Sequence, residues 1–181
     1  MSRVVFLALG ISFVVACGGN EFDSGGSGGS SGSGGSGGAE PADVAGTYNV
    51  SITNRENTCG FADWAEGAET TDVGFTINQN GKTVTGTVDG ATGLWVEFLV
   101  GSRTFSGTVD GNMVHAEIIG TKQHSQGLCS YTVLVVMDSE LVGNALQGEV
   151  VYTAKTNGNA NCGVLETCHA RQEFSGSRPP K

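Results

Sequence analysis

The stretch FTINQNGKTVTGTV, residues 75–88, decides the fold class. Apolar and polar residues alternate on both sides of the pair Asn80-Gly81, as they do in half-buried strands joined by a tight turn. An Asn-Gly pair between two alternating runs is the strongest short-range signal for a β-hairpin. The stretch therefore predicts two antiparallel strands in direct succession.

The same pattern recurs through the rest of the chain. Asp110-Gly111 is a second hairpin candidate, of type I′. No window carries a helical stripe of useful length. Evenly spaced short strands between turn residues are typical of a sandwich or a barrel. The further alternating runs cover 47–53, 105–109, 113–119, 131–137, 146–155 and 170–176.

We predict an all-β domain over residues 40–178, an antiparallel up-and-down β-barrel of about eight strands, with 179–181 as a short tail. The count of eight holds if 94–101 is a crossing loop segment and not a strand. Gly86, Gly107 and Gly148 would then face inward, because glycine inside a strand lets a small barrel bend tightly.

The N-terminus has the features of an export signal. Arg3 supplies a positive start, and residues 4–16 form an apolar run that is too short to span a bilayer. The run ends in Val14-Val15-Ala16-Cys17, which resembles the lipobox of bacterial lipoproteins, with Val14 where that family most often has Leu. The resemblance implies removal of residues 1–16, a diacylglycerol on the Cys17 thiol and acylation of the new amine, with palmitate as the expected acyl group.

A linker separates this cysteine from the domain. Residues 24–38 contain only Gly and Ser, so they have no apolar surface to bury, and we take 17–39 as the lipidated N-terminus and a flexible tether. Its root-mean-square reach is roughly 25 Å. We expect a lipid-anchored protein of the bacterial cell envelope. Because Gly18 replaces the Asp that holds some lipoproteins in the inner membrane, the outer membrane is favoured.

Two segments resemble the ends of lipocalin-like and avidin-like barrels. Gly46-Thr47-Tyr48 corresponds to the Gly-x-Trp of the first lipocalin strand, with tyrosine in place of tryptophan, and 174–176 corresponds to the last strand. The arginine that closes a lipocalin barrel would be Arg171 or Arg178. The resemblance implies the architecture of a small β-barrel.

Four cysteines remain beyond Cys17, and an even number in an exported chain reads as two disulfides. With eight strands, all four lie at one end of the barrel. The first and last strands of a closed meander are neighbours, which allows Cys59–Cys168 together with Cys129–Cys162. Cys59–Cys129 with Cys162–Cys168 is the open alternative.

Composition and motifs exclude several functions. The net charge of −9 argues against nucleic-acid binding. No nucleophile elbow stands outside the linker, and no zinc-protease or deaminase signature is complete, so we expect neither an enzyme nor a metal or other cofactor. His115 and Glu117 share the solvent face of a strand, and residues 157–163 read as a turn and not as a calcium loop.

Four side chains are candidate ligand contacts. Phe61, Trp64 and Trp95 fall in long connections at the cysteine-braced end, where they would either form the lip of a binding site or plug the barrel. Of the two tryptophans, Trp64 stands among charges that favour a lip, and Trp95 stands among apolar residues that favour a plug. Gln172 faces inward by alternation.

The function that these features favour is a membrane-tethered binding module for a small hydrophobic ligand or a protein partner. The alternative is a structural or envelope-interaction lipoprotein whose barrel is packed and has no pocket. A cavity of several hundred Å³ would favour the first.

Overall fold

The computed structural model describes residues 39–62 and 64–180. Nine strands form one antiparallel sheet in the order β5-β4-β3-β2-β1-β9-β8-β7-β6. The strands are β1 (Gly46–Asn57), β2 (Glu69–Asn80), β3 (Thr83–Val88), β4 (Thr104–Asp110), β5 (Met113–Ile119), β6 (His124–Gln126), β7 (Cys129–Val142), β8 (Ala145–Thr156) and β9 (His169–Ser177).

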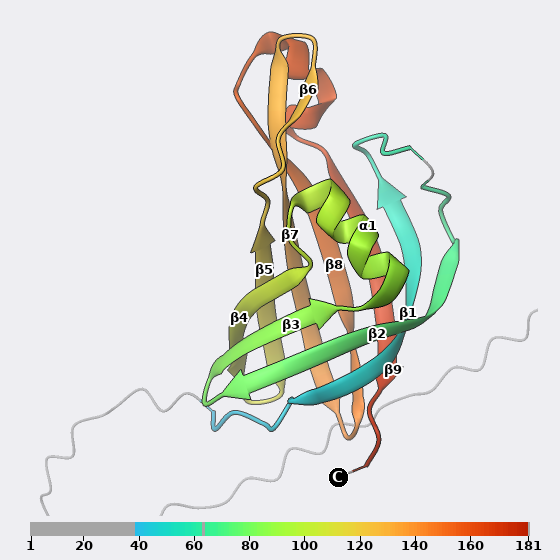
Figure 1. Ribbon diagram of the computed structural model, residues 1–181, viewed down its shortest axis with the longest axis vertical. Helices are drawn as coiled ribbons and strands as arrows, with labels where there is room; N and C mark the ends of the chain where they lie inside the picture. Colours follow the sequence, from blue (N-terminus) through green and yellow to red (C-terminus); the bar gives the residue numbers. More distant parts are fainter. Residues whose placement is uncertain (1–38, 63, 181) are drawn as a thin grey trace, which may run out of the picture. The chain divides into compact units, whose positions relative to one another are not determined.

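Pairing between β5 and β7 closes eight of these strands into a barrel (Figure 1). Within the ring, each strand pairs with the strands before and after it in the sequence, and β5 pairs with β7 because β6 is not part of the ring. The first strand, β1, also pairs with the last, β9. The short β6 pairs only with the start of β7 and lies outside the ring. The predicted up-and-down barrel of eight strands is therefore confirmed.

The strands alternate between the barrel interior and solvent, as the sequence pattern predicted. In β1, Tyr48 and Val50 are buried, and in β5 the inward Val114 and Ala116 alternate with the exposed His115. The three predicted inward glycines occupy the same side of their strands as buried neighbours. At Gly86 a Cβ atom would come within 2.5 Å of the Phe75 ring, so glycine there makes room for an aromatic side chain.

We call the end of the barrel that carries the two-residue turns between strands the closed end. The turns are Gly81-Lys82, Gly111-Asn112 and Gly143-Asn144. Only the first residue of each has a positive φ, which is the pattern of a type II′ turn. The type I′ assignment for Asp110-Gly111 is therefore wrong: Asp110 pairs with Met113, and Gly111 comes first in the loop.

An arginine fastens the closed end. The Arg178 guanidinium lies 5.5 Å from the centroid of the Tyr48 ring and donates hydrogen bonds to the carbonyl oxygens of Ala45 and Asp43. Tyr48 is fully buried, and its hydroxyl donates to the Val44 carbonyl at 2.8 Å. Of the two arginines considered from the sequence, Arg178 has this position, whereas Arg171 pairs with glutamates on the outer surface.

The connection between β3 and β4 is a helix, α1 (Gly90–Val100), which the sequence analysis did not predict. Gly93, Val96 and Val100 are buried, but the opposite face carries Leu94 and Phe98, which are 62% and 72% exposed. Because the helix is apolar on both faces, it shows no periodic stripe. The expectation that 94–101 is not a barrel strand is correct, but the segment is helical and not a loop.

Two disulfides join the loops at the other end, which we call the open end. Cys59 is bonded to Cys168, and Cys129 to Cys162, the first of the two pairings considered. Cys162 lies in a short 3-10 helix, η1 (Ala160–Glu166), and not in an irregular loop. Figure 1 shows η1 and β6 together at one end of the barrel domain, with the C-terminus near the other end of that domain.

The N-terminal predictions lie outside the described residues. These are the leader 1–16, the lipidation site Cys17 and the linker up to residue 38. Among the residues that the structure does describe, no helix has the length and apolar character needed to cross a membrane.

Candidate ligand-binding cavity

A cavity of about 410 Å³ occupies the half of the barrel next to the open end. Strand residues form its walls, while the β1–β2 loop and α1 contribute to its rim. It is lined by Val50, Ile52, Asn54, Ala62, Trp64, Thr70, Val73, Phe75, Val88, Ala91, Thr92, Trp95, Val96, Phe105, Met137, Val150, Tyr152, Gln172 and Phe174. No described lining residue carries a charge.

The deeper wall is apolar. The Phe75 and Phe105 rings meet edge to face, with centroids 6.1 Å apart, and both side chains are buried. Met137 and Val150 continue this surface on β7 and β8. Such a wall favours apolar ligand atoms because burial removes their surface from water.

Three polar side chains form a chain of hydrogen bonds along the cavity. The buried Tyr152 hydroxyl donates to Gln172 Oε1 at 2.8 Å, and Gln172 Nε2 donates to Asn54 Oδ1 at 2.8 Å. Burial raises the pKa of the Tyr152 hydroxyl well above its ordinary value of 10.0, which keeps the proton on the donor. The direction of the chain follows, because this hydroxyl has no other acceptor among the described residues.

The β1–β2 loop places its aromatic side chains by local hydrogen bonds. The Asn57 side chain donates to the Phe61 carbonyl and accepts from the Phe61 backbone N–H, each at 3.0 Å. Phe61 packs against Trp64, whose ring meets Tyr152 edge to face at a centroid distance of 5.9 Å. Because Tyr152 also bonds to Gln172, the loop is coupled to the polar chain in the cavity.

The helix α1 is fastened to the opposite side of the rim. In its C-terminal turn, the Val100 carbonyl accepts hydrogen bonds from the backbone N–H groups of Thr121 and Lys122. The His124 imidazole lies 2.7 Å from the Leu99 carbonyl and stacks on Tyr131. These contacts hold the end of α1, while Trp95 at its middle faces the cavity and solvent.

Three of the four predicted ligand contacts line the cavity: Trp64, Trp95 and Gln172. Phe61 does not. It lies behind Trp64, against both the main core and the disulfide cluster. Its place is explained by the Asn57 hydrogen bonds, which turn the start of the loop toward the cysteines.

The burial of the two tryptophans is the reverse of the expectation. Trp95 is 46% exposed, whereas Trp64 is half-buried against the core. Trp95 turns outward because the buried stripe of α1 passes through Gly93 and Val96. The charges near Trp64 do not prevent its ring from packing on Tyr152.

Sequence reasoning missed Asn54 and Tyr152. Both follow from alternation: Asn54 continues the inward series of Val50 and Ile52, and Tyr152 continues that of Val150. The rule that placed Gln172 inward would have found them.

Other polar candidates have structural partners. His115 lies on the outer surface, 2.6 Å from Asp138 Oδ1, and His169 is 3.0 Å from Glu56 Oε2. Within residues 39–62 and 64–180, no group of three or more His, Cys, Asp or Glu residues could hold a metal ion.

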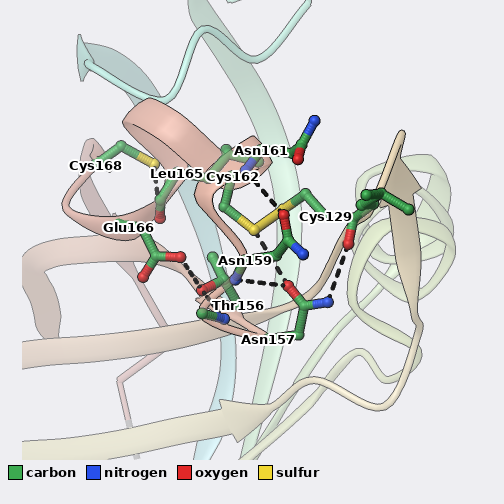
Figure 2. The surroundings of a disulfide bond; sticks show 11 residues. Cys129, Thr156, Asn157, Asn159, Asn161, Cys162, Leu165, Glu166 and Cys168 are labelled. Atoms are coloured by element: carbon green, nitrogen blue, oxygen red, sulfur yellow. Dashed lines mark hydrogen bonds between the residues drawn. A yellow bond between two sulfur atoms is a disulfide. The ribbon is translucent and has the colours of Figure 1, made fainter.

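The asparagine-rich segment beside the second disulfide is built as a turn (Figure 2). The Asn157 and Asn159 side-chain oxygens accept from the backbone N–H groups two residues further on, at 3.2 and 3.0 Å. Asn157 Nδ2 donates to the Leu128 carbonyl. The side-chain oxygens of Asn157 and Asn159 thus accept hydrogen bonds from the backbone that leads to Cys162, which agrees with the predicted turn.

Comparison with protein-family models, with curated protein sequences and with solved structures found no match to this chain.

Proposed function

We propose that the barrel binds one small, predominantly apolar molecule in the cavity at its open end. The observation that carries this proposal is the cavity itself. Its volume of about 410 Å³ falls in the usual range for ligand sites, and its lining is mainly apolar with a few converging polar groups. A packed barrel without a pocket, the alternative structural role, is disfavoured by the same observation.

We further propose that this binding module acts at the bacterial envelope, tethered through a lipid on Cys17. The support is the lipobox-like sequence before Cys17 and the Gly/Ser linker after it. From the Gly/Ser composition of this linker we expect a reach of roughly 25 Å, which would keep the barrel near a membrane surface and leave its mouth free to turn. We expect Cys17→Ser to abolish both acylation and partition into detergent. An unacylated N-terminus at another residue of the wild-type protein would overturn this part.

Binding is tested with N-phenyl-1-naphthylamine, a neutral apolar probe that fluoresces in apolar surroundings. We expect saturable, one-site binding to the wild-type protein. Ile52→Trp places a large ring in the cavity and should abolish the signal, because Ile52 faces inward. Thr53→Trp is the matched control, since the next residue of β1 lies outside the cavity, and it should bind as the wild type does.

A ligand carried through purification would show the natural molecule. Mass spectrometry of the native, processed protein should find a small apolar compound in the wild type and in Thr53→Trp, and not in Ile52→Trp. Equal probe binding by a folded Ile52→Trp protein would overturn the cavity as the site.

A second candidate function is contact with an envelope protein through α1. It is favoured by Leu94 and Phe98, two apolar side chains that α1 exposes to solvent. Replacing both by Ser should then weaken retention of the protein in native envelope complexes without changing probe affinity. If probe affinity falls and retention does not, α1 serves the cavity alone.

A further inference from the structure

We infer that the cavity selects uncharged ligands that carry a hydrogen-bond acceptor, such as a ketone, ester or amide, next to an apolar chain. This inference rests on the proposed function, and it names the chemical class of the ligand. It follows from the direction of the hydrogen-bond chain and from the charge of the lining.

The hydrogen-bond chain ends in donors. Tyr152 uses its hydroxyl proton on Gln172 Oε1, and Gln172 Nε2 donates to Asn54 Oδ1. The acceptor oxygens of both amides thereby receive a hydrogen bond inside the protein. The Asn54 Nδ2 group makes no hydrogen bond with any residue that the structure describes. An amide nitrogen has two N–H donors, so Asn54 has both to offer and Gln172 has one.

These donors border the cavity. Asn54 and Gln172 are both lining residues, on the neighbouring strands β1 and β9, where they form a registered pair. The backbone of Asn54 is held as well: its N–H donates to the Ala68 carbonyl at 2.9 Å, and its carbonyl accepts from Gly67 at 2.8 Å. The Asn54 backbone is thus held by two hydrogen bonds, and its side-chain oxygen is held by the bond from Gln172. These contacts keep the free side-chain N–H groups in place before a ligand arrives.

The remaining lining decides the charge of the ligand. Within the described lining there is no Lys, Arg or His to pair with a carboxylate, and no Asp or Glu to pair with an amine. Burial of an ionised group without a partner is costly, and the net charge of −9 adds repulsion for anions. Neutral acceptors avoid both costs and satisfy the amide donors.

The test is a competition against N-phenyl-1-naphthylamine with four ligands that share an eight-carbon skeleton: octane, methyl hexyl ketone, octanoate and octylamine. We expect methyl hexyl ketone to displace the probe about three- to tenfold more tightly than octane, the gain of one neutral hydrogen bond. Octanoate and octylamine, both ionised at pH 7, should be weaker than the ketone. Equal affinity for octane and the ketone would overturn the inference.

Variants identify the donor. Asn54→Asp keeps an oxygen that accepts from Gln172 but replaces the amide NH2 by a second acceptor oxygen and adds a negative charge, so the preference for the ketone over octane should be lost. Asn78→Asp is the matched control, because Asn78 is exposed on the outside of β2, and it should keep the preference. If Asn54→Asp does not fold, Asn54→Leu, which is uncharged, similar in size and without donors, gives the same comparison.

The outcomes separate this inference from the function on which it rests. Probe binding that Ile52→Trp abolishes, without ketone preference, would leave the proposed function standing and refute the acceptor class. A ketone preference that survives in folded Asn54→Asp and Asn54→Leu would refute the assignment to Asn54. Absence of any probe binding by the wild type would refute both.

Discussion

The two ends of the barrel are built by different means from the same eight strands. At the closed end, the turns have two residues, and a buried tyrosine, an arginine and backbone carbonyls seal the interior. At the open end, the connections are long, and they are held by two disulfides, α1 and η1. The cavity lies next to the open end.

The different construction of the two ends assigns them different roles: the closed end contributes to stability, and the open end holds the proposed binding site. The Arg178 guanidinium and the Tyr48 hydroxyl donate hydrogen bonds to backbone carbonyls, and neither residue lines the cavity. The open end keeps an aromatic rim and unused amide donors, and it relies on covalent bonds to hold its loops. We therefore expect substitutions at the closed end to cost stability alone and those at the cavity to change affinity.

The largest expected effect is the loss of the Cys59–Cys168 bond, which spans 109 residues of sequence. By the loop-entropy relation, Cys59→Ser with Cys168→Ser should lower the free energy of unfolding by roughly 5 kcal/mol. The Cys129–Cys162 bond spans 33 residues, so its double variant should lose roughly 4 kcal/mol. Denaturant unfolding measures both. A larger loss for the shorter loop would show that native contacts, and not the unfolded chain, set these costs.

Tyr48→Ala tests the closed end. Tyr48 is 0% exposed, and deletion of a buried large aromatic side chain costs about 3–5 kcal/mol. The affinity for N-phenyl-1-naphthylamine should stay at the wild-type value, because Tyr48 does not line the cavity. Thermal unfolding and probe titration of the same sample measure the two quantities. A fall in affinity in the folded variant would show that the two ends are coupled.

The two tryptophans test the rim. Trp64→Ala should lower stability by about 2–3 kcal/mol, less than a fully buried aromatic, because the ring is half-buried against Tyr152. Trp95→Ala should cost about 1 kcal/mol or less, since its side chain is 46% exposed. Both should weaken probe binding. A greater stability loss for Trp95→Ala would contradict the burial described here.

Much of the barrel was predictable because strand alternation and Gly-containing turns are local signals. The count of eight strands followed, and with it the common end of the four cysteines. The helix α1 was not predictable by periodicity, because Leu94 and Phe98 are apolar on its exposed face. Among the cavity residues, strand alternation predicted the inward position of Gln172. The burial of Trp64 depends on a contact with Tyr152, far away in sequence, which no local pattern encodes.

Tyr152→Phe should have a small effect on stability at neutral pH and a more informative one at alkaline pH. It removes the hydrogen bond to Gln172 and should cost about 1 kcal/mol at pH 7. Burial raises the pKa of Tyr152 above the 10.0 of the unfolded chain, so the unfolded state loses its proton first. The stability that this group contributes is thus fully present below pH 10 and is lost as pH rises beyond it, by up to about 1.4 kcal/mol per unit.

The Tyr152→Phe variant has no ionisable hydroxyl at this position, so it does not lose stability in this way as the pH rises. Its deficit relative to the wild type should shrink above pH 10 and then reverse, while Tyr48, whose pKa burial also raises, acts equally in both proteins. Urea unfolding from pH 7 to pH 11 follows the difference. A constant difference across that range would mean that Tyr152 ionises at the same pH in the folded and unfolded states. The hydroxyl would then not be held as a buried donor, and the direction assigned to the chain through Gln172 to Asn54 would lose its basis.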